Sequence, residues 1–196
     1  MNSLTIIEWP PLPGAESVAP AWQNDLLVLA TQVPPGASRE SARADIRAAA
    51  CEVAGLLLDV GEERLEITAT PGSAPRLLVD GEDVGIGVSI GHADTLSLAA
   101  LHRKGAVGID VMQIGLASDW ARVAHDYLGM ASATLLAAAS EAERPLAFCQ
   151  AWTRREAALK LRGEKLAEWS AGSTPPASSC FTLVLADGYT GTVAIA

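Results

Sequence analysis

Apolar residues recur along this chain with two different periodicities. Short apolar runs that end at glycine, proline or aspartate predict β-strands. We expect strands at residues 4–7, 26–30, 64–70, 76–80, 85–90, 96–101 and 106–112. The chain closes with FTLVLADGYTGTVAIA, in which two apolar runs flank Asp187-Gly188, a pattern typical of a β-hairpin.

Three other segments have helical spacing. From Ser38 to about Leu58, apolar residues recur every three or four positions, and Ser38 is suited to cap the helix N-terminus. Two further helices are predicted at about 118–128 and 143–162, and residues 170–179 read as a connecting loop. This order predicts an α+β fold with two halves of similar content, residues 1–104 and 105–196. No residue-level repeat relates the two halves.

Composition narrows the classes of function. Hydrophobic residues make up 49% of the chain and charged residues 19%, which indicates a folded protein. The net charge of −9 argues against a nucleic acid or a membrane surface as partner, since both select for excess Lys and Arg. An anionic ligand would therefore need a local basic cluster. The absence of a signal-peptide pattern and of an apolar run of ~20 residues leads us to expect a cytoplasmic protein.

One such cluster is a row of arginines on the first predicted helix. Arg39, Arg43 and Arg47 recur every four residues and so share one helical face. Like charges at this spacing repel each other by a few tenths of a kcal/mol. The row is consistent with a solvated face and equally with a phosphate bound across it.

Two single residues are further candidates. His92 follows a predicted strand in VSIGHAD; a lone histidine is more often structural, but in a turn it can give a hydrogen bond and charge to a phosphate. Asp110 ends the apolar run AVGIDV, where burial is costly unless the carboxylate is paired or binds a cation. One carboxylate alone is a weak indication of a metal site.

The segment WTRREAALK places Trp152, Glu156 and Lys160 on one face of the last predicted helix. Taken alone, Glu156 and Lys160 would form a surface salt bridge worth about 0.3–0.5 kcal/mol. Together with Asp110 and His92, they would supply carboxylates for a divalent cation and positive charge for phosphate oxygens. That combination is typical of phosphoryl transfer.

These motifs resemble a known family. The pair VGIDV (107–111) and FCQAWTRREAALKLRG (148–163) resembles the signature of the Sfp-type 4'-phosphopantetheinyl transferases, and VSIGHAD and TPGSAPRLLVDG resemble two of its other segments. The resemblance extends from about Ser38 to Leu166. It implies a monomer with the 4'-phosphopantetheinyl transferase fold, two similar α/β halves related by a pseudo-two-fold axis, with coenzyme A and Mg²⁺ between them. It also implies transfer of the phosphopantetheine arm of coenzyme A to a serine of an acyl, polyketide or nonribosomal peptide carrier protein, releasing adenosine 3',5'-bisphosphate.

The same resemblance implies roles for individual residues. Asp110 and Glu156 would hold Mg²⁺, and Glu156 would also help to deprotonate the carrier serine. Lys160 would contact the pyrophosphate and act in catalysis, and His92 would contact a phosphate of coenzyme A. The resemblance assigns further coenzyme A contacts to Arg43 or Arg47 for the 3'-phosphate, to Arg155 in place of a usual lysine, and to Arg76 near the position of another.

The chain departs from the family pattern at several positions. Met112 stands where many members have a second acidic residue, so water is expected to complete the metal shell. Ala74 replaces a phosphate-binding lysine. Two alternatives follow: a degenerate homologue that binds coenzyme A or a carrier protein without transfer, and a purely structural α+β protein.

Overall fold

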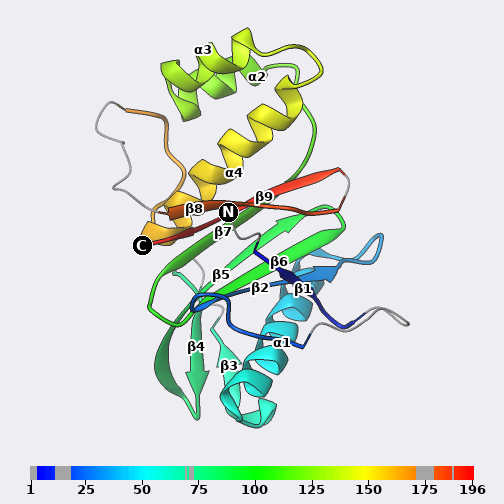
Figure 1. Cartoon of the computed structure of the whole chain (residues 1–196), viewed down its shortest axis with the longest axis vertical. Coiled ribbons are helices and arrows are strands. Elements are labelled where there is room, and N and C mark those ends of the chain that lie inside the picture. Colours follow the sequence, from blue (N-terminus) through cyan, green and yellow to red (C-terminus); the bar gives the residue numbers. More distant parts are fainter. Residues whose placement is uncertain (1–3, 12–18, 69, 71–72, 171–178, 187) are drawn as a thin grey trace.

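Four layers build the fold: a long helix, two stacked β-sheets and a second long helix (Figure 1). The computed structural model describes residues 4–11, 19–68, 70, 73–170, 179–186 and 188–196. Within them, the first sheet has the strand order β1-β2-β6-β5-β4-β3 and the second β7-β9-β8. The strands are β1 (Ile6–Glu8), β2 (Leu26–Gln32), β3 (Leu65–Ile67), β4 (Arg76–Val79), β5 (Glu82–Ala93), β6 (Leu96–His102), β7 (Val107–Gln113), β8 (Ser179–Leu183) and β9 (Tyr189–Ile195). The helices are α1 (Arg39–Leu58), a 3-10 turn (Glu62–Arg64), α2 (Trp120–Val123), a π-helical turn (Ala124–Leu128), α3 (Met130–Ala138) and α4 (Arg144–Arg162).

The central strands of the first sheet are apolar on both faces because both faces are covered. In β2, Leu27 and Leu29 pack against the buried face of α1, whereas Leu26 and Val28 pack against the second sheet. Side chains of a strand alternate between the two faces, so this division follows directly from the unbroken apolar run. The strand β6 is divided in the same way.

The first strand of the second sheet divides its side chains differently. Val107, Ile109 and Val111 of β7 pack against the first sheet. The alternate positions of β7 face α4, and here the chain has Gly108 and Asp110 instead of large apolar residues. A Cβ atom at Gly108 would lie 1.9 Å from the carbonyl oxygen of Ala157, so glycine lets α4 approach the strand backbone closely. The fold thereby brings a carboxylate under the last long helix.

Both long helices begin and end as their sequences suggest. The Ser38 hydroxyl accepts a hydrogen bond from the backbone N–H of Ser41 at 3.0 Å, which confirms the predicted cap of α1. The helix α4 has Pro145 in its first turn and ends at Gly163, whose φ of 66° lies in the left-handed region. Lys160 lies in the last turn of α4, three residues before Gly163.

Several elements differ from the predicted ones. The predicted strand at 64–70 is reduced to β3, while β5 runs on to Ala93, so His92 lies within a strand and not in a turn after it. The helix α3 was not predicted at all. The antiparallel pairing of β8 with β9 confirms the hairpin, although Asp187 and residues 171–178 of the predicted loop lie outside the described residues.

The observed architecture confirms the α+β class. Every strand of the first sheet precedes Gly105 and every described strand of the second follows it. An apolar core lies between the sheets and takes residues from both, among them Leu98 and Val193. In the part of the chain that the structure describes, no helix has the length and apolar character needed to span a bilayer.

Candidate active site

A cleft of about 700 Å³ opens between α1, β5, β7 and the end of α4. It brings together six of the predicted site residues from both sheets and both long helices: Arg43, Arg47, His92, Asp110, Glu156 and Lys160. Other lining residues include Arg39, Ala74, Met112, Trp152, Glu164 and Lys165. Two predicted residues, Arg76 and Arg155, are not among those that line it.

Asp110 is the most buried charged group of the cleft. Its side chain is 15% exposed, and its β7 position directs it toward α4. Burial raises the pKa of Asp110, while the Lys160 ammonium and the backbone N–H of Val111 act in the opposite direction. A carboxylate in this position needs a cation close by to remain ionised.

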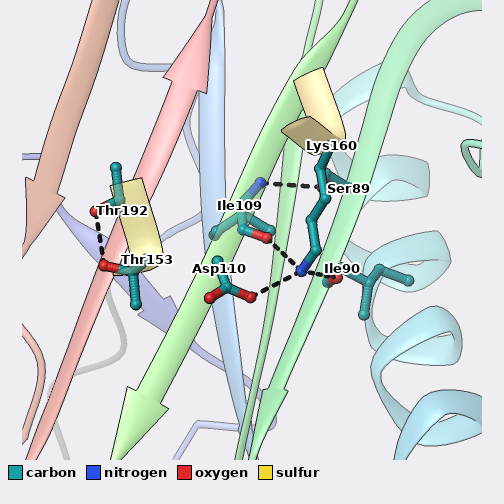
Figure 2. A network of polar contacts seen from close by, with 7 residues as sticks. All are labelled: Ser89, Ile90, Ile109, Asp110, Thr153, Lys160 and Thr192. Atoms are coloured by element: carbon teal, nitrogen blue, oxygen red, sulfur yellow. Dashed lines mark hydrogen bonds and ion pairs between the residues drawn. The ribbon is translucent and has the colours of Figure 1, made fainter. Parts of the chain in front are cut away.

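Lys160 supplies that cation and also connects the two sheets. Its Nζ donates to Asp110 Oδ1 at 2.9 Å, to the carbonyl of Ile109 at 2.9 Å and to the carbonyl of Ile90 at 3.2 Å (Figure 2). Ile109 and Asp110 belong to β7, whereas Ile90 belongs to β5 of the first sheet. An ammonium has three N–H donors, so all three are engaged.

Glu156 lies one helical turn before Lys160 on the same face of α4. Burial raises its pKa, and the neighbouring charge of Asp110 raises it further, while Lys160 and Arg155 oppose the rise. No hydrogen bond or ion pair joins its carboxylate to another described residue. Two carboxylates that influence each other's charge therefore line the cleft, and Glu156 has no partner of its own among the described residues.

This donor set fits a magnesium ion. Mg²⁺ is commonly held by one or two carboxylates together with substrate phosphates and water. A divalent cation between Asp110 and Glu156 would relieve the repulsion that raises the pKa of Glu156. Among the described residues there is no cluster of three or more His, Cys, Asp and Glu side chains placed to hold a metal. Met112 does not supply a third carboxylate for the metal, in agreement with the expectation from the sequence.

His92 lines the same cleft from β5. Its Nδ1 pairs with the hydroxyl of Ser97 at 2.8 Å, while Nε2 is buried and has no partner among the described residues. Burial, the three arginines of α1 and Lys160 together lower the pKa of His92 to about 4. The imidazole is therefore neutral at pH 7. It can offer an N–H to a ligand but not the charge that the sequence led us to expect.

The arginine row of α1 forms the opposite side of the cleft. Arg39 and Arg43 are exposed and Arg47 is half-buried. None of the three makes a hydrogen bond or ion pair with any residue that the structure describes. Their combined charge is felt by His92, whose pKa they help to lower. Three unpaired guanidinium groups and an unsatisfied imidazole nitrogen thus concentrate positive charge and hydrogen-bond donors on this side of the cleft.

The two predicted residues outside the cleft have other partners. Arg76 forms an ion pair with Asp83 at 3.4 Å. Arg155 donates to the carbonyl of Ala167 at 2.8 Å, and its guanidinium lies over the ring of Trp169, 5.4 Å from the centroid. Both residues carry a charge at the position that the resemblance indicated, but neither guanidinium reaches the cleft. Arg76 is held by Asp83, and Arg155 is held by the carbonyl of Ala167 and the ring of Trp169.

Some residues of the site were missed from the sequence. Ser97, the partner of His92, lies opposite it in the β5–β6 pairing, and the tight connection at Asp94-Thr95 is the signal that would have found it. Ser89 accepts a hydrogen bond from the backbone N–H of Ile109 at 3.0 Å and joins the two sheets beside Lys160 (Figure 2). Lys165 lines the cleft without belonging to any pattern that we recognised.

Comparison with known proteins gives a family match for part of the chain. Residues 106–178 match the family model of the 4'-phosphopantetheinyl transferase superfamily. The matched segment contains Asp110, Glu156 and Lys160, but not His92 or the arginine row. No curated protein matches the chain. The match indicates a transferase and phosphopantetheine transfer as its general chemistry.

Proposed function

We propose that this protein is an Sfp-type, Mg²⁺-dependent 4'-phosphopantetheinyl transferase that uses coenzyme A to modify a serine of a carrier protein. The observation that carries the proposal is the convergence of Asp110, Glu156 and Lys160 with His92 and three unpaired arginines in one cleft. These groups come from both sheets, and the family match covers the half with the carboxylates. We also propose that residues 1–104 and 105–196 are the two related halves of that fold.

In this proposal, Glu156 acts as the general base. It takes the proton of the carrier serine as the serine oxygen attacks the phosphorus that bears the pantetheine arm. The bond from that phosphorus to the bridging oxygen breaks, and adenosine 3',5'-bisphosphate leaves with the bond's electron pair.

The remaining groups of the cleft bind and orient the ligand. His92 donates its Nε2–H to a phosphate oxygen in the tautomer whose Nδ1 accepts a hydrogen bond from the Ser97 hydroxyl. Arg43 or Arg47 meets the 3'-phosphate, and Asp110 and Glu156 would hold Mg²⁺. When bound, the ion would neutralise charge on the pyrophosphate.

Intact-mass spectrometry tests the proposed activity. The purified protein is incubated with coenzyme A, Mg²⁺ and a panel of apo carrier proteins from fatty-acid, polyketide and nonribosomal peptide synthesis. We expect one carrier to gain the mass of one phosphopantetheine. The Glu156→Gln variant should lower the rate by about 10²–10⁴-fold, the usual contribution of a general base, and EDTA should stop the reaction.

The degenerate homologue is the competing outcome of this experiment. Ala74 and Met112 line the cleft but offer neither a cation nor a carboxylate, which favours that alternative. Binding of coenzyme A by the wild-type protein with no mass gain on any carrier would replace transfer by binding alone. Failure to bind coenzyme A at all would leave only a structural role.

A further inference from the structure

We infer that Ser97 is a positioning residue, which holds His92 as a neutral Nε2–H donor for a phosphate group of the ligand. The inference rests on the proposed function and deepens it at one contact. Ser97 lies outside VSIGHAD and the other segments that resemble the family, and outside residues 106–178 of the family match. Its role therefore follows from the contacts of this chain.

Ser97 is the centre of a row of three polar side chains that crosses the first sheet. In the strand pairing it lies opposite His92 of β5 on one side and opposite Thr31 of β2 on the other. Residues that lie directly opposite each other point to the same face of a sheet, so all three side chains share one face. Leu29 and Ala99, two positions along β2 and β6, pack in the core beneath α1, so the row lies on the face that α1 covers.

Both ends of this row carry a buried atom without a hydrogen-bond partner among the described residues. The two atoms are Thr31 Oγ1 and His92 Nε2. Between them, Ser97 is 0% exposed, and its hydroxyl pairs with His92 Nδ1 at 2.8 Å. Within the part of the chain that the structure describes, this is the one hydrogen bond that the Ser97 side chain makes.

The hydroxyl of Ser97 decides which ring nitrogen of His92 carries the proton. A buried hydroxyl needs an acceptor for its own proton, and Nδ1 is the partner that the described residues offer to Ser97. If Nδ1 carried the proton instead, the Ser97 O–H would lack an acceptor and the lone pair of Nε2 would lack a donor. One unsatisfied group costs less free energy than two, so the neutral ring carries its proton on Nε2.

The group that remains unsatisfied is then a donor in the basic part of the cleft. His92 lines the cleft together with the arginine row, and its pKa of about 4 keeps the ring neutral at pH 7. The positive charges of the arginine row and Lys160 act on this ring and attract an anion to it. A ring with its proton on Nδ1 would present a lone pair to a phosphate oxygen, and the contact would be repulsive. By fixing the proton on Nε2, Ser97 makes the neutral ring a donor for that anion.

Calorimetric titration with coenzyme A tests the role of Ser97. We expect Ser97→Ala to raise the dissociation constant by about 3–10-fold, the usual effect of losing one hydrogen bond. Thr31→Val is the matched control, because it removes a buried hydroxyl from the same row, and the oxygen of that hydroxyl has no partner among the described residues. It should leave the dissociation constant unchanged.

A double-mutant cycle separates positioning from a structural effect. If Ser97 acts through His92, Ser97→Ala should cause no further loss of affinity once His92 has been replaced by alanine. His92→Ala alone should weaken binding more than Ser97→Ala does, because it removes the donor itself. A general loosening of the sheet would instead add its own loss in both backgrounds.

Nuclear magnetic resonance reads the tautomer of His92 directly. Long-range ¹H–¹⁵N correlation spectra of protein with ¹⁵N-labelled histidine distinguish a protonated from an unprotonated ring nitrogen. The His92→Gln variant identifies the signals of His92 among the three histidines of the chain. At pH 7 we expect a protonated Nε2 and an unprotonated Nδ1 in the wild-type protein, with and without coenzyme A. In Ser97→Ala we expect a share of the form with its proton on Nδ1.

Each contrary result has a distinct meaning. A proton on Nδ1 of His92 in the complex with coenzyme A would overturn the inference, and so would equal affinities of the wild-type protein and Ser97→Ala. Losses that add up in the double variant, or an unchanged tautomer in Ser97→Ala, would show that Ser97 does not act through His92. In all these cases the proposed function would stand. A wild-type protein that binds no coenzyme A would instead remove the proposed function.

Discussion

His92 shows how the surroundings of a single residue change its chemistry. Its position in VSIGHAD predicted a phosphate contact, and the structure places it in the cleft beside the arginine row. The same arginines, together with burial and Lys160, depress its pKa to about 4. The sequence therefore indicated the place of this residue but not its charge, because the charge depends on residues more than forty positions away.

This pKa has a measurable consequence for stability. An unfolded histidine takes up a proton near pH 6.5, whereas folded His92 resists protonation until about pH 4. Stability contributed by the neutral form is therefore complete above pH 6.5 and is lost as the pH falls toward 4. Allowing for partial solvent screening of a half-buried group, we expect a loss of roughly 1–2 kcal/mol between pH 7 and pH 4.5.

Urea denaturation of wild type and His92→Gln at both pH values measures this loss. Other titrating groups cancel in the difference between the two proteins, because they are common to both. The wild-type protein should lose more stability than the variant as the pH falls. Parallel losses in the two proteins would mean that His92 is exposed enough to titrate normally.

Lys160 was recognised from the sequence, but its contacts were not. The spacing of Glu156 and Lys160 correctly indicated a shared helical face and a shared cleft. The carbonyl of Ile90, 70 residues earlier in the chain, could not be inferred from local spacing. Which acceptors a lysine reaches is decided by how two sheets stack, and periodicity carries no information about that.

At the scale of elements, the packing of the helix α4 on the strand β7 determines the relative positions of Asp110 and Glu156. Gly108 lies where α4 crosses the strand, and an added Cβ would be 1.9 Å from the carbonyl oxygen of Ala157 and 2.6 Å from the backbone nitrogen of Leu161. Both are backbone atoms and cannot rotate aside. The separation between Asp110 and Glu156 therefore depends on this glycine.

Gly108→Ala is expected to push α4 away from β7. We expect a loss of about 1–3 kcal/mol in the free energy of unfolding, as for other overpacked sites, and a larger proportional loss of transferase activity. Urea denaturation and the intact-mass assay measure the two effects. Gly115→Ala is the matched control, since no atom lies within 4 Å of its added Cβ. An unchanged stability in Gly108→Ala would contradict the close packing.

Elements with strong local signals were predicted well. The helix α1 and the strands β4, β6, β7 and β9 lie within a few residues of their predicted bounds. The helix α3 was missed because MASATLLAA lacks an amphipathic period. Arg144 stabilises its end by donating to the carbonyls of Leu136 and Ala139, a contact made from the following helix.

At the scale of the whole molecule, the two sheets share their interior. The core between them takes Leu26 and Leu98 from one sheet and Ile109 and Val193 from the other. Lys160 and Ser89 add polar connections across the same junction. Unfolding one sheet alone would expose the apolar face of the other sheet to water. Partial unfolding is therefore unfavourable, and the two sheets should unfold together.

We therefore expect one cooperative thermal transition for the full chain. In differential scanning calorimetry, the van't Hoff and calorimetric enthalpies should agree, with a ratio of about 1. Ser89→Ala should lower the melting temperature and keep the single transition, since it removes one acceptor from the junction and leaves the shared core intact. Two resolved transitions in the wild-type protein would show that its sheets unfold independently.

The position of the cleft across the junction suggests a use for the protein as a reporter. If the chain were divided after Lys104, one polypeptide would carry the arginine row and His92, and the other Asp110, Glu156 and both cleft lysines. Neither would hold the whole surface that is proposed to bind coenzyme A. Each could be fused to one of two test proteins, and a modified carrier serine would then record that the test proteins had met. The mark is covalent, so it would persist after the two polypeptides separated again.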